Sequence, residues 1–351
     1  MSLHKFILAA IFVFFSSQFL LAGQITLQNG DRLSGVIEKS DDKSLVIKTD
    51  YAGEVSVQLS AIRAIESDQP LHVGLKDGQT VVGLVKTTDD KLEVVPASGA
   101  AVEVSTGTIK QIRNDEEEAA EQKLEHAGWL QAWTGGVSTS FAMTRGNSET
   151  KNLGLAFTAD RKTLHDHLGL YATSVLATND AFGADPSTTA NSNQGGARYD
   201  HNFGTRTFGF GGADFQTDEL QSLDLRSVFG GGIGVHLIKR DRTTLDLLGG
   251  LNYTRESYST IQRNFVALTL GEEFMKKIGS GTVLTQKLYA YPDLNEGGQY
   301  RTTFNFATVT KLSKWLGWQN AFADTYVTNP PLGARQNDII LTTGLNIAFT
   351  R

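Results

Sequence analysis

The sequence has 351 residues, which is room for two or three domains, and it combines 36 glycines with only 6 prolines. This composition suits many twisted β-strands better than disorder. The formal net charge of −6, without any basic run, gives no reason to expect nucleic acid as a partner. Cysteine is absent, which excludes disulfides, thiolate metal sites and cysteine nucleophiles.

Residues 1–23 are predicted to be a secretory signal peptide. His4 and Lys5 precede an apolar run over residues 6–23 that ends in the small residues Ala22 and Gly23. A retained membrane anchor is the alternative, but the run falls short of the roughly 20 apolar residues that span a bilayer. We therefore expect cleavage near Gly23.

Residues 24–70 and 71–113 are two copies of one sequence pattern. ITLQNGDRLSG, from Ile25, matches VGLKDGQTVVG, from Val73. Asn-Gly and Asp-Gly are strong hairpin signals, and the alternating runs around them predict about five short strands in each copy. The copies resemble SH3-like or Sm-like barrels, which implies two tandem β modules. Sm-like barrels often bind RNA, but no basic and aromatic surface is evident here, so we expect a spacer or a protein-docking module.

Residues 114–128, NDEEEAAEQKLEHAG, are predicted to form a helical linker. Asn114 is a suitable N-cap, the acidic residues 115–118 suit the positive end of a helix, and Gly128 suits its C-terminal stop. We interpret the acidic run as a solvated helix face and not as a metal site.

Residues 129–351 contain segments in which apolar and polar side chains alternate. We count twelve, beginning near Leu130, Lys151, His167, Gln194, Thr207, Leu223, Thr243, Arg263, Thr282, Gln299, Trp315 and Asp338. In the sixth segment Leu223, Leu225 and Phe229 share one face, and the other face carries charged residues and glycines. The pattern predicts an all-β chain whose second half is a twelve-stranded antiparallel transmembrane β-barrel.

The links between these segments alternate in length. Residues 179–193, 255–262, 292–298 and 329–337 are longer polar links, whereas the links between them, such as GTR and LSK, are short. Outer-membrane barrels have short periplasmic turns and longer external loops. The alternation therefore predicts a barrel in the cell outer membrane, with both of its ends and the N-terminal modules in the periplasm.

A barrel of this size has a narrow interior. Twelve strands spaced about 4.8 Å apart and tilted by about 40° give a backbone radius of roughly 12 Å. Charges of both signs are expected to line the lumen, from Arg198, Asp200, Asp224, Arg226, Asp246, Arg301 and Lys311. Such charges would either form a path for a small polar or charged solute or pair with one another and close the barrel.

An enzyme is the rival class of protein. Outer-membrane phospholipases of twelve strands place Ser, His and Asn on the outer wall, but no GxxHxSNG-like stretch occurs here. His165 and His167 are interpreted as turn residues, and Asp293, Asn295 and Gly297 as an exposed turn. We predict no enzyme activity, no catalytic residue, no metal and no cofactor. A lipid-modifying enzyme in the barrel wall remains the alternative, and a soluble secreted binding protein a third possibility.

Aromatic residues near the segment ends are expected to anchor the barrel in the membrane interface. They are Trp129, Trp133, Trp315, Trp318, Tyr171, Tyr289 and Tyr291.

The last segment, TTGLNIAF over residues 342–349, resembles the outer-membrane insertion signal through Gly344, Ile347 and Phe349. This resemblance implies that the barrel assembly machinery recognises the strand. Residues 128–157, GWLQAWTGGVSTSFAMTRGNSETKNLGLAF, resemble the salt-induced outer-membrane protein family, a domain of unknown function. That resemblance covers about residues 128–351 and implies an envelope barrel that responds to salt or stress. The expected partners are outer-membrane lipid, the assembly machinery, and a periplasmic protein or a small polar solute.

Overall fold

The computed structural model describes residues 23–41, 43–88, 91–144, 150–179, 187–259, 261–330 and 335–350, with the backbone alone for residues 142–144. The predicted signal peptide, up to residue 22, lies outside the described residues, as does the Arg-Gly-Asn turn at 145–147. The chain forms two compact units, which meet between Lys123 and Leu124. No helix of the described residues is both long and apolar enough to cross a membrane.

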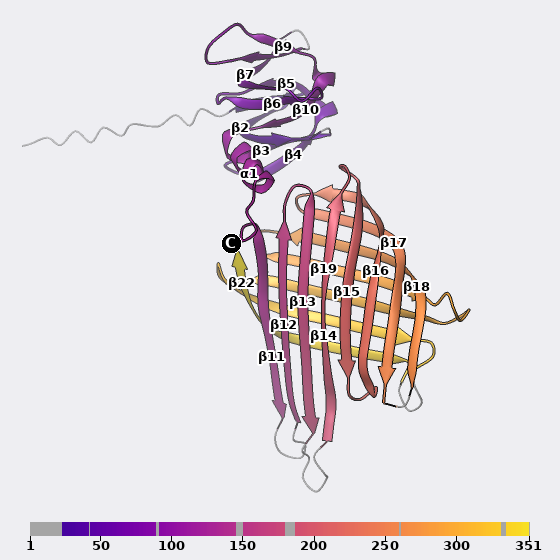
Figure 1. Cartoon of the computed structure of the whole chain (residues 1–351). Coiled ribbons are helices and arrows are strands. Elements are labelled where there is room, and N and C mark those ends of the chain that lie inside the picture. Colours follow the sequence, from indigo (N-terminus) through magenta and orange to yellow (C-terminus); the bar gives the residue numbers. More distant parts are fainter. Residues whose placement is uncertain are drawn as a thin grey trace, which may run out of the picture. The chain divides into compact units, whose positions relative to one another are not determined.

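The N-terminal unit consists of short antiparallel strands (Figure 1). In the described residues they are β1 (Gly23–Leu27), β2 (Arg32–Ser40), β3 (Ser44–Thr49), β4 (Gly53–Gln58), β5 (Ile62–Glu66), β6 (Leu71–Leu75), β7 (Thr80–Thr88), β8 (Lys91–Val95), β9 (Val102–Val104) and β10 (Ile109–Arg113). Single 3-10 turns, η1 (Leu59–Ala61) and η2 (Thr106–Thr108), precede β5 and β10.

These strands form one barrel and not two. Six of the described strands pair in the ring β1-β5-β7-β6-β10-β2, and β2 pairs with β1 to close it. Strands β3 and β4 extend from β2, and β8 and β9 extend from β7. The structure thus differs from the prediction of two tandem SH3-like modules, because the last ring strand of each copy pairs with the other copy.

The two crossings between the copies are equivalent. Where β5 meets β7, the Ile65 N–H donates to Thr87 Oγ1 at 2.9 Å, and where β10 meets β2, the Ile112 N–H donates to Ser40 Oγ at 2.9 Å. Both copies also supply the single apolar core, from Ile25, Ile37, Leu45, Ile47, Val57, Ile65, Leu71, Val73, Val85, Leu92, Val94, Val104 and Ile112. Neither copy has a separate core, because their apolar faces meet inside the shared ring.

The predicted hairpin turns are confirmed. Strands β1 and β2 are joined at Asn29-Gly30, and β6 and β7 at Asp77-Gly78. Gly30 and Gly78 have φ of 91° and 92°, the left-handed region that glycine tolerates and other residues avoid.

Helix α1 (Asp115–Glu125) follows β10, and Asn114 is its N-cap as predicted. The Glu117 N–H donates to Asn114 Oδ1 at 2.9 Å. Glu118 accepts from Arg113 Nη1 at 3.1 Å, and Glu117 forms an ion pair with Lys39 at 3.4 Å. The acidic first turn is therefore bound to the N-terminal barrel by cationic side chains.

The C-terminal unit is a closed antiparallel barrel of twelve described strands, which confirms the predicted fold and strand number (Figure 1). They are β11 (Trp133–Thr144), β12 (Thr150–Lys162), β13 (Asp166–Asn179), β14 (Ser187–Asn202), β15 (Thr207–Asp218), β16 (Leu223–Arg240), β17 (Thr243–Tyr258), β18 (Gln262–Ile278), β19 (Thr282–Pro292), β20 (Tyr300–Lys311), β21 (Leu316–Val327) and β22 (Asn337–Thr350).

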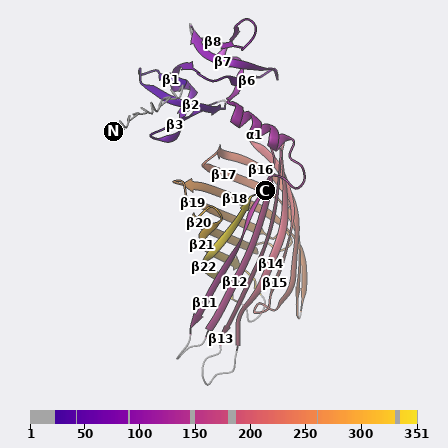
Figure 2. The same ribbon diagram turned by 90° about the vertical axis from the view of Figure 1, so that its left-hand side faces the viewer.

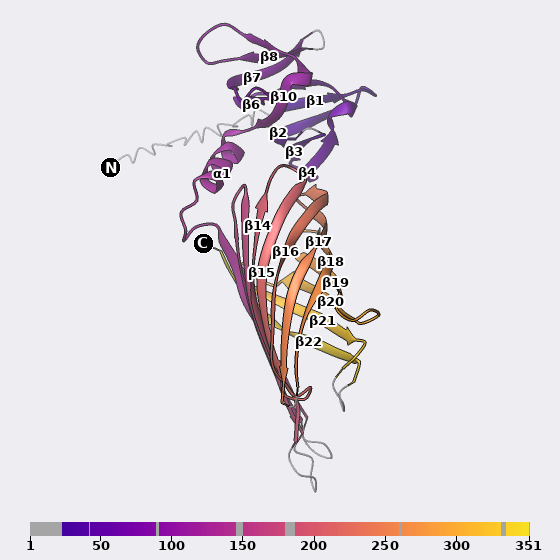
Figure 3. The same cartoon turned by 45° about the vertical axis from the view of Figure 1, so that its right-hand side comes forward.

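The barrel closes where β11 pairs with β22, from Thr134 opposite Thr350 to Thr139 opposite Leu345 (Figure 2). Every other strand pairs with its neighbours in sequence, as the wall from β14 to β18 shows (Figure 3). Because the strand number is even, β11 begins and β22 ends at the same end of the barrel, here called the termini end. The opposite end is called the loop end.

The links at the loop end are less extended than predicted. Strand β17 continues to Tyr258 and β18 begins at Gln262, so most of the expected link over residues 255–262 is strand. Strand β14 begins at Ser187 and takes up the second half of the expected link over residues 179–193. The links over residues 293–299 and 328–336 remain longer than the turns at the termini end, such as residues 241–242.

Candidate functional site: the barrel interior

The two faces of the barrel wall have opposite chemistry. Large apolar side chains that alternate along the strands are exposed on the outer face; Ile233 is 69% and Leu341 is 78% exposed. On the inner face, the polar side chains of Arg226, Asn252 and Glu256 are almost fully buried. Side chains alternate strictly between the faces of a strand, so the strand register assigns the remaining residues.

The register places six of the seven predicted lumen residues on the inner face. Arg198 and Asp200 lie there on β14, Arg226 on β16, Asp246 on β17, and Arg301 and Lys311 on β20. Asp224 is the exception. It lies at a register shift between Leu223 and Leu225, where the extra residue breaks the alternation, and its side chain is exposed.

One group of interior side chains lies toward the termini end and crosses the lumen. Arg198 contacts Asp200 Oδ1 at 2.7 Å through Nε, and Glu273 Oε1 and Tyr289 Oη, both at 3.0 Å, through Nη1. Lys287 forms a further ion pair with Glu273 at 3.2 Å. Strands β14 and β18 are separated by three strands in the wall, so the contact between Arg198 and Glu273 bridges the interior.

This group extends along the wall through histidines. His167 contacts Asp160 at 2.7 Å and Asp200 at 3.4 Å. His236 contacts Asp246 at 2.7 Å, and its ring stacks on Phe208. Three of the predicted charges at this end of the lumen are therefore paired: Arg198 with Asp200, and Asp246 with His236. Among the described residues, no group of three or more histidine, aspartate or glutamate side chains is arranged to hold a metal ion.

A second group lies toward the loop end. Arg226 donates through Nε to Glu256 Oε1 at 2.7 Å and through Nη1 to Gln216 Oε1 at 2.8 Å. Tyr258 donates to the other Glu256 oxygen at 3.1 Å. Only 3% of Arg226 and 6% of Glu256 is exposed, so this ion pair is buried, and further hydrogen bonds support both partners, as a desolvated ion pair requires. The guanidinium of Arg301 lies 4.4 Å from the centre of the Tyr291 ring.

Three of the predicted interface aromatics belong to the interior instead. The hydroxyl of Tyr289 donates to Glu273, that of Tyr171 donates to Asp214, and Tyr291 supports Arg301. The expectation that these tyrosines anchor the barrel in a membrane interface is therefore wrong. Trp129, Trp315 and Trp318 are exposed, near the termini end, as an anchoring role requires.

Sequence reasoning also missed the acidic partners of the lumen arginines. Glu256 falls in the predicted link over residues 255–262. In the eighth segment Glu272 and Glu273 are adjacent, so alternation alone does not say which of the two faces inward. The register shows that Glu272 points outward beside Leu247 and Leu288, and that Glu273 pairs with Asp246 and Lys287 on the inner face. Residues two apart on a strand share a face, so Tyr289 and Tyr291 lie on the same face of β19 as Lys287, which is the inner face.

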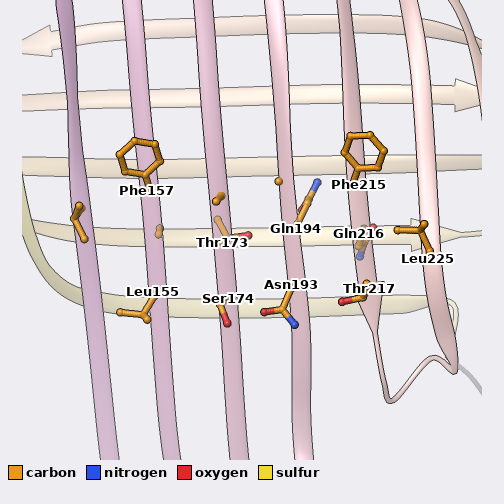
Figure 4. A pocket seen from close by; sticks show the side chains of 14 residues that line it. Leu155, Phe157, Thr173, Ser174, Asn193, Gln194, Phe215, Gln216, Thr217 and Leu225 are labelled. Carbon is orange, nitrogen blue, oxygen red and sulfur yellow. The ribbon is translucent and has the colours of Figure 1, made fainter.

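The outer wall has a groove of about 500 Å³ over β11–β16. Figure 4 shows Ser174, Asn193 and Thr217 in one row, below the rings of Phe157 and Phe215. Ser174 pairs in register with Asn193, and Asn193 with Thr217. Among the described residues that line this groove there is no histidine, aspartate or glutamate. A serine nucleophile here would thus lack the base that activates it.

The residues of the predicted insertion signal lie on β22 at the closing seam. Ile347 and Phe349 are outward and partly exposed, and Gly344 faces inward. A Cβ on Gly344 would come within 2.1 Å of the Thr139 carbonyl oxygen, so the approach of β22 to β11 requires glycine at this position.

These features define a closed, twelve-stranded β-barrel with an apolar outer wall and a charged interior. The sequence matches the family described as "Protein of unknown function, DUF481" over residues 137–349, and the chain belongs to this family. No curated protein matches the sequence.

Several solved barrels are similar in structure at low sequence identity. The KdgM porin is 12% identical, with a TM-score of 0.33, over 62% of this chain and 99% of that chain. The translocator domain of the autotransporter NalP from Neisseria meningitidis is 12% identical, with a TM-score of 0.36, over 66% and 94%. An anion-selective porin from Comamonas acidovorans is 12% identical, with a TM-score of 0.30, over 62% and 98%.

Proposed function

We propose that this protein is an outer-membrane β-barrel of a bacterial envelope and that its lumen is a narrow channel for small polar or charged solutes. The observation that carries the proposal is the inverted wall, with large apolar side chains exposed outside and charged side chains buried inside. In water such an outer face would be a very large apolar patch, which soluble proteins avoid. In a bilayer the same face is solvated by lipid, and in the closed ring every strand is hydrogen-bonded to a neighbour on each side.

The size and contents of the lumen support a small solute. The backbone radius is roughly 12 Å before side chains are added. The bridge between Arg198 and Glu273 crosses this space, and Arg226 and Glu256 fill part of it nearer the loop end. A general pore for large solutes would need a wider free section.

Planar-bilayer recording of the purified full-length protein tests the channel. We expect discrete conductance steps. A second measurement, the migration of unheated against boiled samples on a gel, reports whether the barrel is folded, because folded outer-membrane barrels migrate anomalously. A folded sample without discrete conductance would contradict the channel.

A closed structural barrel is the second candidate, and the contact between Arg198 and Glu273 favours it. An ion pair between strands that are not neighbours in the wall stiffens the cylinder and obstructs the lumen at the same time. The two candidates differ in the effect of Glu273→Gln. A channel would show an altered conductance, whereas a structural barrel would stay silent and lose stability.

The N-terminal barrel is proposed to lie in the periplasm and to dock a partner there. The support for this proposal is chain connectivity: strand β11 begins at the termini end, and few residues separate it from helix α1. Strands β4 and β9 each pair with one neighbour among the described strands, which leaves an edge that a partner strand can extend. Protease added to intact cells should spare this unit until the outer membrane is permeabilised. Cleavage in intact cells would refute the placement.

Strand β22 is further proposed to carry the signal for the barrel assembly machinery, with Phe349 as the terminal aromatic. Phe349→Ala should lower the amount of folded barrel in outer-membrane fractions, and Thr350→Ala should not.

A role in salt or envelope stress is part of the same proposal, and it predicts that the protein level rises at high salt. A lipid-modifying activity is not expected, and incubation with labelled phospholipid or lipopolysaccharide would reveal it as product.

A further inference from the structure

Arg301 differs from the other two arginines that carry the interior groups. Arg198 binds two carboxylates and a tyrosine hydroxyl, and Arg226 binds a carboxylate and an amide oxygen. Among the described residues, no oxygen atom accepts a hydrogen bond from the Arg301 guanidinium, and no carboxylate lies within ion-pair distance of it. Its contact is the face of Tyr291.

The carboxylates near Arg301 are hydrogen-bonded to other side chains. Arg226, Glu256 and Asp214 are close enough to act on it electrostatically. Glu256 is already bound by Arg226 and Tyr258, and Asp214 already accepts from the Tyr171 hydroxyl. The nearest carboxylates are therefore engaged elsewhere, and a second cation stands beside Arg301.

A guanidinium withdrawn from bulk water normally has its N–H groups satisfied, because an unpaired buried charge is costly. Here the side chain is half-buried, faces the lumen and lies over the ring of Tyr291. A fixed planar guanidinium with free donors suits bidentate recognition of a carboxylate or a phosphate.

We propose that Arg301, supported by Tyr291, is a binding site inside the lumen for the carboxylate or phosphate group of a small anionic solute. The site deepens the proposed channel function and rests on it, because the solute must enter the lumen to reach β20. It lies near the loop end, so a solute entering from that side meets Arg301 before the bridge of Arg198 and Glu273.

Calorimetric titration of the folded full-length protein in detergent micelles tests the site without requiring conduction. Sodium phosphate and sodium citrate are the two probes, and they separate phosphate from carboxylate recognition. We expect saturable binding of at least one of them, weakened about tenfold or more by Arg301→Gln, which is about 1.4 kcal/mol. Arg301→Lys keeps the positive charge but lacks the planar guanidinium that donates two parallel hydrogen bonds, so it should restore only part of the affinity.

Matched controls distinguish the site from a general loss of charge. Lys311→Gln removes one positive charge from the same strand at its other end and should leave the affinity within about twofold. Tyr291→Phe keeps the aromatic face and should also bind, whereas Tyr291→Leu should weaken binding. Heat-dependent gel migration confirms that each variant is folded.

Unchanged affinity in folded Arg301→Gln would overturn the site, as would a folded wild-type protein that binds neither probe. Bilayer recordings separate this failure from failure of the channel. A protein that conducts without binding either anion refutes the site alone, and one that binds without conducting refutes the channel alone.

Discussion

Both units of this chain contain a closed antiparallel β-barrel, but one buries apolar side chains and the other buries charged side chains. In the N-terminal ring, apolar side chains such as Ile25, Leu45 and Ile47 are buried, and most of the exposed side chains are polar. In the twelve-stranded barrel, Arg226 and Glu256 are buried and large aliphatic side chains are exposed. Alternation of period two generates both arrangements. The face that turns inward therefore depends on the medium outside the barrel, water for one and lipid for the other in the proposed function.

The largest expected effect tests the polar interior. Glu256→Leu leaves Arg226 buried without its carboxylate and should destabilise the barrel by about 3–5 kcal/mol. Replacing both partners, as in Arg226→Met with Glu256→Leu, should recover most of this loss, because no charge is then left unpaired. Urea unfolding in lipid vesicles measures both variants by tryptophan fluorescence, since all four tryptophans lie in the C-terminal unit. A single variant that costs under about 1 kcal/mol would mean that the interior is well hydrated.

The corresponding test of the apolar interior is Ile47→Ala in the N-terminal ring. Ile47 has no exposed surface, so the truncation should leave a cavity and cost about 2–5 kcal/mol. Calorimetry of the full-length protein should show a lower melting temperature for the N-terminal transition and an unchanged barrel transition. Tyr51→Ala, at a side chain that is 75% exposed, is the control and should shift neither. A shift of both transitions would show that the two units unfold together.

The outer wall is tested by charge at two depths. Ile233→Arg, in the middle of β16, should destabilise the barrel in vesicles by about 2–4 kcal/mol, and Ile339→Arg, near the loop end of β22, by about 0–1 kcal/mol. The reason is that an arginine near the surface reaches the headgroups, whereas one at the midplane cannot. Equal effects at the two positions would contradict a lipid-facing wall. The readout is again urea unfolding by tryptophan fluorescence.

The smallest effect concerns the ion pairs of helix α1. Burial opposes ionisation of Glu118, but hydrogen bonds from Arg113 and Gln122 outweigh it and hold its pKa below the ordinary value. Stability from Glu118 is therefore fully present above the ordinary carboxyl pKa near 4.3 and is lost as the pH falls through the lower folded-state value. Glu118→Gln should cost about 1 kcal/mol at pH 7 and nothing in strong acid.

Calorimetry of the N-terminal transition across pH measures this effect. The control is Glu116→Gln, an exposed residue of the same helical turn. A cost of Glu118→Gln that persisted in strong acid would assign the effect to packing and not to charge.

The C-terminal barrel could be predicted because its signals are local. Each strand carries its own alternation, and neighbours in sequence pair in the sheet. Eleven of the twelve predicted starts lie within three residues of the observed strand starts, and Gln194 is the exception. Aromatic placement failed for Tyr171, Tyr289 and Tyr291, because position near a strand end was weighed above parity. The face of a side chain is fixed by the strand register. Tyr289 is two residues from the charged Lys287 on the same strand, which indicates that both face the lumen.

The N-terminal ring could be predicted in its strands but not in its closure. The Asn-Gly and Asp-Gly turns fix the hairpins locally. Whether β5 completes the ring with its own copy or with the other depends on contacts far apart in sequence, and the repeat is compatible with both. The partners of the lumen arginines were missed for a related reason, since Arg198 and Glu273 come together only when the wall curves around.

Strands β5 and β10 each pair with a strand of the other copy, and this has a consequence for how the unit is assembled. A single copy would leave β5 without its partner β7 and β2 without its partner β10, and it would complete a ring only by associating with an identical chain. The N-terminal unit thus has the architecture of a homodimer whose subunits have been joined head to tail. Removing one copy would not yield half of a working domain. It would leave an open sheet whose unpaired edges can pair with a second molecule.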